Sequence, residues 1–265
     1  MGLLKNTTVP ITSNYSPEVD SSSELNEENS TYYKSLIGIL RWIVEMDRMD
    51  IITEVSTLSS YVAMPREGHF NQVLHIFAYL KSHHNARLML DPSYQDVKEE
   101  YFEKNGDWSS YYEDEIDLPP KNAPEPKAKK FTLREYVDAS HTTCKLTRQS
   151  RTGFLVFLNS APMFWFSKKQ GSCEVSTFGS EFVAMRQYCE YIRGMRYKLR
   201  MMGISVNNPT IIYGDKQSVL WNTSVPDSTK KKKTSAVAYN YCREGISQNE
   251  WVMKYTSNKQ IQVAL

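Results

Sequence analysis

The chain has few cysteines, no long apolar run and no leader-like start. Its 265 residues include four cysteines, none of them in a CxxC pair, which argues against a disulfide-rich secreted domain. The most apolar stretch, residues 35–46, is broken by Arg41 and Glu45, so it is too short for the ~20 residues of a membrane span. The first 30 residues lack the basic start and apolar centre of a signal peptide. We therefore expect an intracellular protein of the cytoplasm or nucleus, with no membrane partner.

Charge is divided unevenly along the chain. Residues 1–130 contain 13 basic and 21 acidic side chains, a net charge of −8, whereas residues 131–265 contain 19 and 9, a net charge of +10. A basic domain attracts polyanions through counterion release and electrostatic steering, which favours a nucleic acid as partner. The alternative is a basic surface that is only solvated, and charge alone does not decide between them.

Composition and hydrophobic period change several times along the chain. Four segments are predicted: 1–30, 31–94, 95–130 and 131–265. Residues 1–30 are rich in Ser, Asn, Glu, Thr and Pro, and we expect an extended or disordered strap there. Residues 31–94 show helical periods near 31–46, 51–63 and 67–82, then a short strand pattern near 86–94. Residues 95–130 are first acidic and aromatic and then rich in Pro and Lys, which is typical of a linker.

The fourth segment alternates between strand and helix patterns. Three strands with turn residues between them indicate an antiparallel meander, and a long helix follows, which Gly203 ends. A short, wholly apolar strand suits the interior of a sheet. In chain order the predicted elements are strands 133–140, 151–159 and 161–169, helix 177–202, strand 210–215, helix 233–246 and strand 251–256. This order predicts an α/β domain.

Three carboxylates stand at the ends of these elements. Asp138 lies near the end of the first strand, Asp215 follows the fourth strand, and Glu181 lies in the first turn of the long helix. Strand ends and helix starts open the crevice of an α/β sheet, so the side chains can converge there. Carboxylates bind hard cations such as Mg²⁺, and two such ions about 4 Å apart can clamp both oxygens of a phosphodiester displacement. Each residue alone has a structural alternative, such as the helix dipole for Glu181. Together they predict a magnesium-dependent nuclease.

Three long motifs fill the same half of the chain. They read YVDASHTTCKLTRQSRTGFLVFLNSAPMFWFSKKQGSCEVSTFGSEFVAMRQ, IIYGDKQSVLWNT and STKKKKTSAVAYNYCRE. These motifs resemble the ribonuclease H (RNase H) domain of copia-type retrotransposon Pol polyproteins, and residues 32–90 resemble the end of the preceding reverse transcriptase. The resemblance implies an RNase H-like mixed five-stranded sheet flanked by helices, preceded by a small helical remnant of the reverse transcriptase thumb or connection.

The resemblance also implies an activity. The substrate would be an RNA/DNA hybrid whose RNA strand is hydrolysed with two Mg²⁺ ions, or with Mn²⁺ as an alternative. Asp138 is similar to the carboxylate that both metals share, Glu181 to the ligand nearest the ribose 2′-hydroxyl, and Asp215 to the one that helps to place the attacking water. A 2′-hydroxyl contact is what distinguishes RNA from DNA. The rest of a Pol polyprotein would be a further partner, and a virus-like particle a further location.

Polar and basic residues near the strand ends are candidates for phosphate contacts. Their structural alternative is a solvated hairpin end or a solvated charge run. The candidates are Arg148, Arg151, Thr152, Lys168, Lys169, Gln170, Lys232 and Lys233.

The sequence departs from the family pattern at two places. The family's last Asp corresponds to a position near Val263, which offers no carboxylate, and the Asn that follows the fourth-strand Asp is Lys216 here. We therefore expect an impaired nuclease, and the alternative is an inactive retroelement relic that still binds nucleic acid. The chain lacks a palm motif before Tyr32, so polymerase activity is not expected. An integrase-like nuclease is a third reading, but no His/His/Cys/Cys zinc module accompanies the acidic trio.

Overall fold

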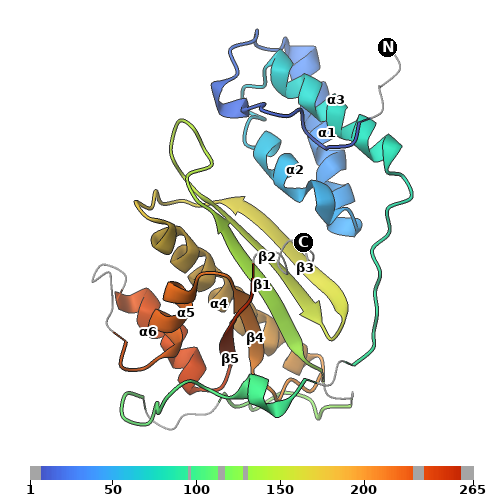
Figure 1. Cartoon of the computed structure of the whole chain (residues 1–265). Coiled ribbons are helices and arrows are strands. Elements are labelled where there is room, and N and C mark those ends of the chain that lie inside the picture. The colour runs from blue at the N-terminus through green and yellow to red at the C-terminus, as the bar shows by residue number, and fades with distance from the viewer. Residues whose placement is uncertain (1–6, 95–96, 113–116, 128–130, 229–235, 258–265) are drawn as a thin grey trace. The chain divides into compact units, whose positions relative to one another are not determined.

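The structure, a computed structural model, describes residues 7–94, 97–112, 117–127, 131–228 and 236–257 (Figure 1). Contacts divide the chain into two units, which are described separately. Unit 1 comprises Met1–Leu88, Thr142–Arg151 and Phe166–Cys173. Unit 2 comprises Met89–His141, Thr152–Trp165 and Glu174–Leu265.

Helices dominate unit 1. They are α1 (Glu27–Met46), α2 (Ile52–Ser59) and α3 (Glu67–Ser82), with short 3₁₀ turns at Pro17–Val19 and Met49–Ile51. The third predicted helix is confirmed at both ends. The first begins four residues before the expected Thr31, because the side chain of Asn26 accepts a hydrogen bond from the Asn29 N–H at 2.9 Å and caps the helix there. The second ends at Ser59, earlier than residue 63.

The strand expected in residues 86–94 is absent, so that prediction was wrong. Those residues adopt no regular structure, and Met89 and Leu90 are 80% and 65% exposed. A strand needs a neighbour to satisfy its backbone groups, and no described strand lies against this segment. The apolar pattern alone could not show that the partner was missing.

A five-stranded sheet lies mostly in unit 2, and Arg151 of β2 and residues 166–169 of β3 belong to unit 1. Its strands are β1 (Leu133–Ser140), β2 (Arg151–Leu158), β3 (Ala161–Lys169), β4 (Thr210–Gly214) and β5 (Trp251–Tyr255). All five were predicted within one residue at each end. Their order across the sheet is β3-β2-β1-β4-β5, so the apolar β4 lies inside the sheet as expected.

The sheet is mixed. β1, β4 and β5 run parallel to one another. β2 and β3 are neighbours joined by only Asn159 and Ser160, and Asn159 has a φ of +55°, as tight antiparallel hairpins require. The α/β fold class, with a mixed five-stranded sheet flanked by helices, is confirmed.

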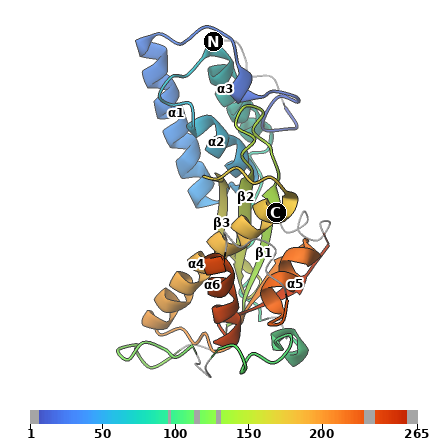
Figure 2. The same cartoon turned by 90° about the vertical axis from the view of Figure 1, so that its left-hand side faces the viewer.

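Three α-helices complete the described part of unit 2: α4 (Thr177–Met201), α5 (Gln217–Ser224) and α6 (Ala236–Ser247), with a short 3₁₀ turn at Glu99–Phe102. Residues 233–235, where the last helix was expected to begin, lie outside the described residues. α5 was not predicted, because its eight residues form too few turns for a helical period to be recognised in the sequence. Figure 2 shows α4 and α6 beside each other next to the sheet. No described helix is long and apolar enough to cross a membrane.

The long helix and the central strand share the core of unit 2. α4 begins at Ser176, whose side chain accepts from the Gly179 N–H at 3.2 Å, and stops before Gly203, which has a φ of +74°. β1 alternates buried and half-buried residues along its length. Its buried positions, which include Val137, pack in the layer between the sheet and α4.

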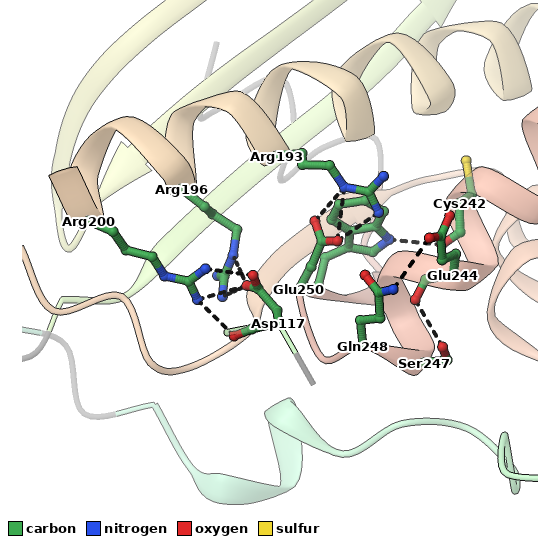
Figure 3. A network of polar contacts seen from close by, with 10 residues as sticks. Asp117, Arg193, Arg196, Arg200, Cys242, Glu244, Ser247, Gln248 and Glu250 are labelled. Atoms are coloured by element: carbon green, nitrogen blue, oxygen red, sulfur yellow. Dashed lines mark hydrogen bonds and ion pairs between the residues drawn. The ribbon is translucent and has the colours of Figure 1, made fainter. Parts of the chain in front are cut away.

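Residues 97–112 and 117–127 belong to unit 2 by their contacts. Trp108 is 6% exposed, and its indole N–H donates to the carbonyl oxygen of Asn105 at 3.0 Å. Further along, Asp117 accepts hydrogen bonds from Arg196 and Arg200 of α4 (Figure 3). The segment with linker-like composition is therefore held against the sheet domain at several points.

Candidate metal centre

Three carboxylates converge in unit 2. Asp138 lies near the end of β1, Asp215 directly follows β4, and Glu181 belongs to α4. One oxygen atom of each lies within 4.8 Å of the other two, and all three residues are half-buried. The convergence predicted from the sequence is thus confirmed as geometry.

The strand register explains why the two aspartates meet. β1 and β4 are adjacent and parallel, and Tyr136 is paired with Tyr213. Two residues further along each strand, Asp138 and Asp215 leave the same end of the sheet at the same level. Strand ends of this kind form the crevice of an α/β sheet.

Glu181 reaches the pair from the helix. It is the fifth residue of α4, so it lies one turn further into the helix than the predicted first turn. The backbone N–H of Ala139 donates to Asp138 Oδ1 at 2.8 Å. The same N–H lowers the pKa of both Asp138 and Glu181, so it favours the ionised form of the two carboxylates.

The electrostatics of the site call for positive charge. Burial raises the pKa of Asp138, and the neighbouring Asp215 raises it further. Burial, and then the charges of Asp138 and Asp215, raise the pKa of Glu181 to about 8, against the lowering effects of Lys216 and the Ala139 N–H. These shifts mean that three negative charges are costly at this spacing without a cation.

The trio fits a hard divalent cation. All three side chains offer oxygen atoms, which such ions prefer. Asp215 Oδ1 is buried and has no hydrogen-bond partner within the described part of the chain. A bound cation would satisfy this oxygen. The oxygen ligands and the negative charge of the trio therefore both match a metal site.

Lys168, Lys169 and Arg148 are exposed, as a phosphate contact requires. Lys168 and Lys169 end β3, and Arg148 lies in the loop before β2 with a φ of +56°. Their role as phosphate ligands stays a prediction. Lys232 and Lys233 lie outside the described residues.

Three other candidates do not present their side chains to a ligand. Thr152 and Gln170 are 0% and 1% exposed. Arg151 donates to the hydroxyl groups of Ser56 and Thr57 within unit 1, at 3.0 and 2.7 Å. The predicted phosphate contact is not supported for these three residues, because Thr152 and Gln170 are buried and Arg151 is already hydrogen-bonded.

A hydrogen bond beside the trio could not be predicted from the sequence. His141 Nδ1 lies 3.2 Å from Ser180 Oγ, and this hydroxyl donates to the carbonyl oxygen of Thr177 at 3.0 Å. No spacing rule links residues so far apart in the chain. Only the position of His141, three residues after Asp138, could have drawn attention to it.

Comparison with known proteins gives relatives at low identity. No family model matches the chain. It is 23% identical over 231 residues to the "Retrovirus-related Pol polyprotein from transposon RE1" of Arabidopsis thaliana, covering 87% of this chain and 13% of that protein. The corresponding protein from transposon RE2 is 21% identical with the same coverage. The chain thus spans about an eighth of the length of these relatives.

Similar solved structures include ribonucleases H and a viral reverse transcriptase. RNase H1 from Halobacterium salinarum NRC-1 is 10% identical and gives a TM-score of 0.38, covering 49% of this chain and 89% of that one. The protease-reverse transcriptase of prototype foamy virus is 13% identical with a TM-score of 0.36, covering 58% and 23%. The resemblance stated from the motifs is confirmed: this chain is similar to a fragment of a retrotransposon Pol polyprotein.

Proposed function

We propose that the chain is an RNase H-type nuclease that hydrolyses the RNA strand of RNA/DNA hybrids. The observation that carries the proposal is the convergence of Asp138, Glu181 and Asp215 within 4.8 Å at the end of two parallel strands. The similarity to Pol polyproteins supports the same class of activity. The proposed cofactor is Mg²⁺, bound as two ions, with Mn²⁺ as an alternative.

The residues of the site would have different roles in the reaction. Asp138 and Asp215, fixed by the strand register, and Glu181, fixed by α4, would hold the cations. A divalent cation, when bound, supplies an activated water and neutralises charge on the phosphodiester. The Ala139 N–H donates to Asp138, and the half-buried setting of the trio limits competition from bulk water. Lys168, Lys169 and Arg148 are the proposed phosphate contacts.

We propose that the activity is weak. The resemblance places the family's last carboxylate near Val263, which lies outside the described residues and is not acidic. Lys216, close enough to lower the pKa of Glu181, also opposes a cation by charge repulsion. Three carboxylates with a lysine nearby should bind the second ion poorly.

Further proposals rest on the resemblance. Residues 31–94 would derive from the end of a reverse transcriptase, without polymerase activity in this chain. The rest of a Pol polyprotein is a proposed partner, and the proposed location is the cytoplasm, the nucleus or a virus-like particle.

The test is hydrolysis of a hybrid with a labelled RNA strand, in Mg²⁺ and in Mn²⁺, by the full chain. We expect slow cleavage, lowered more than about 100-fold by Asp138→Asn, since loss of a ligand should exceed the usual 10 to 100-fold effect of its supporting residues. Asp107→Asn is the matched control, because Asp107 is exposed and bonds only to Ser109.

Two outcomes would overturn the proposal. Cleavage that survives in Asp138→Asn would remove the trio from the reaction. Hybrid binding without cleavage in the unmodified chain would favour the inactive relic.

A further inference from the structure

A pocket opens in unit 2 beside α5. Its volume is about 680 Å³, within the range of ordinary ligand pockets. α5 and the end of β5 form its walls, and Asn105 closes one side, held by a hydrogen bond from its side-chain amide to Ser224 Oγ at 3.1 Å. None of the carboxylates of the metal centre lines it.

Two aromatic side chains of the pocket face solvent. Trp221 is 63% exposed and Tyr255 is 55% exposed. Large aromatic rings stabilise a fold most when they are buried, so two exposed rings at one cavity contribute little to folding. They form a surface on which a flat ligand can pack. Nucleobases stack on such rings whatever their sequence.

Asn222 lines the pocket with a fixed amide. Its side-chain N–H donates to the carbonyl oxygen of Ser218 at 2.7 Å, which fixes the orientation of the amide. The residue is only 3% exposed, and its Oδ1 is buried out of reach of a ligand. Asn222 therefore contributes to the wall of the pocket, and contact with a ligand falls to the exposed rings.

The pocket adjoins the metal centre along the chain. Tyr255 is paired with Gly214 in the β4–β5 register, and the Thr256 N–H donates to the Gly214 carbonyl oxygen at 3.0 Å. Gly214 directly precedes Asp215, and Gln217, which lines the pocket, begins α5. A strand that reaches the carboxylates can therefore place a neighbouring base against Trp221.

We propose that this pocket binds one unpaired nucleobase of a single-stranded segment next to the hybrid. The ring stacks on the exposed side chains of Trp221 and Tyr255. Lys254, whose ammonium group bonds the carbonyl oxygens of Glu100 and Glu103, adds positive charge at the same wall. This inference rests on the proposed function, because it assumes that nucleic acid is the substrate.

Photochemical cross-linking tests whether the pocket binds an unpaired base. The full chain carrying Asp138→Asn, which leaves the nucleic acid uncut, is irradiated with a hybrid whose single-stranded overhang contains 5-iodouracil. Mass spectrometry should place the adduct on Trp221 or Tyr255. Trp42, 67% exposed in α1 of unit 1, is the internal control and should stay unmodified. Adducts on Trp42 at an equal yield, or none on the pocket residues, would overturn the proposal.

Affinity supplies the second measurement. Trp221→Ala should weaken binding of the overhang hybrid about 5- to 150-fold, the effect of losing one base stack, and Trp221→Phe should restore most of it. Trp42→Ala should change nothing. Uridine monophosphate in place of the overhang distinguishes a free nucleotide from a strand: if only the free nucleotide binds, the proposed ligand is wrong.

The outcomes separate this proposal from the nuclease proposal. Cross-linking at Trp221 without hydrolysis by the unmodified chain would support the base-binding pocket and refute the nuclease proposal. Hydrolysis without any adduct or loss of affinity would support the nuclease proposal and refute the base-binding pocket.

Discussion

Asp117 Oδ2 accepts two hydrogen bonds from the guanidinium group of Arg196, at 2.9 Å from Nη2 and 3.1 Å from Nε. The Arg196 side chain is 2% exposed, and Asp117 is 18% exposed. Arg200 donates to the same carboxylate at 2.6 and 2.7 Å (Figure 3). A residue from the linker-like segment thus neutralises a buried charge on α4.

Asp117→Ala should therefore destabilise unit 2. Removing one partner of a buried ion pair leaves an uncompensated charge, which costs about 3–5 kcal/mol in the free energy of unfolding. Urea unfolding of the full chain measures this. Lys98→Ala is the control in the same segment, because its pair with Glu100 is exposed and should contribute about 0–1 kcal/mol. Equal effects of the two substitutions would show that residues 97–127 do not support the sheet domain.

The strands of unit 2 could be predicted from sequence because local pattern and tertiary structure agree. β1 alternates in burial along its length, with Glu135 as the one charged residue at a buried position, and β4 is apolar because it lies between two strands. Gly203 marked the end of α4 because its positive φ favours glycine. Where the information was not local, prediction failed. The apolar residues Met89 and Leu90 looked like a strand, but none of the described strands pairs with them.

The candidate site was predictable in part for the same reason. Element ends and residue type were enough to select Asp138 and Asp215, and the register then brought them together. The state of Arg151 depends on Ser56 and Thr57, almost a hundred residues earlier, so its sequence neighbours could not reveal it. The orphan acceptor of Asn222 likewise appears only once the packing of α5 is known.

Glu135 should make stability depend on pH. It is 0% exposed on β1, neither carboxylate oxygen has a hydrogen-bond partner in the described residues, and burial raises its pKa well above the ordinary 4.5. The folded state therefore favours the protonated form. Its contribution to stability is fully present below about pH 4.5 and is lost as the pH rises through the raised pKa.

Glu135→Met should remove this penalty. At pH 7 we expect the free energy of unfolding to rise by about 1–3 kcal/mol, the usual cost of an unsatisfied buried polar group. The difference from the unmodified chain should shrink at low pH. Urea titrations from pH 4 to 8 measure it, with the exposed Glu45→Met as control, expected within about 0.5 kcal/mol. A loss of stability at pH 7 would mean that Glu135 has a partner in solution.

Two helical glycines should respond to alanine with opposite signs. A Cβ at Gly245 in α6 would lie 2.0 Å from the ring of Trp251, which is fully buried and donates its indole N–H to the Cys242 carbonyl oxygen at 3.0 Å. Gly245→Ala should cost about 1–3 kcal/mol through overpacking. Gly38 in α1 has nothing within 4 Å of a Cβ, so Gly38→Ala should stabilise by about 0.5–1 kcal/mol. Thermal unfolding of both variants tests the pair, and a harmless Gly245→Ala would place Trp251 elsewhere.

Asp138→Asn should stabilise the cation-free chain and weaken its cation binding. In EDTA, Asp138→Asn should raise the melting temperature, because it removes a charge that repels both Glu181 and Asp215. In Mg²⁺ or Mn²⁺ the order should reverse. The unmodified chain should gain about 2.7 kcal/mol at a cation concentration of 100 times Kd, whereas the variant should gain little. Asp107→Asn, in an exposed turn where the carboxylate accepts hydrogen bonds from Ser109, should follow the unmodified chain in both buffers. If Asp138→Asn melts lower in EDTA, or gains as much from the cation as the unmodified chain, then the three carboxylates are held together by something other than a metal ion.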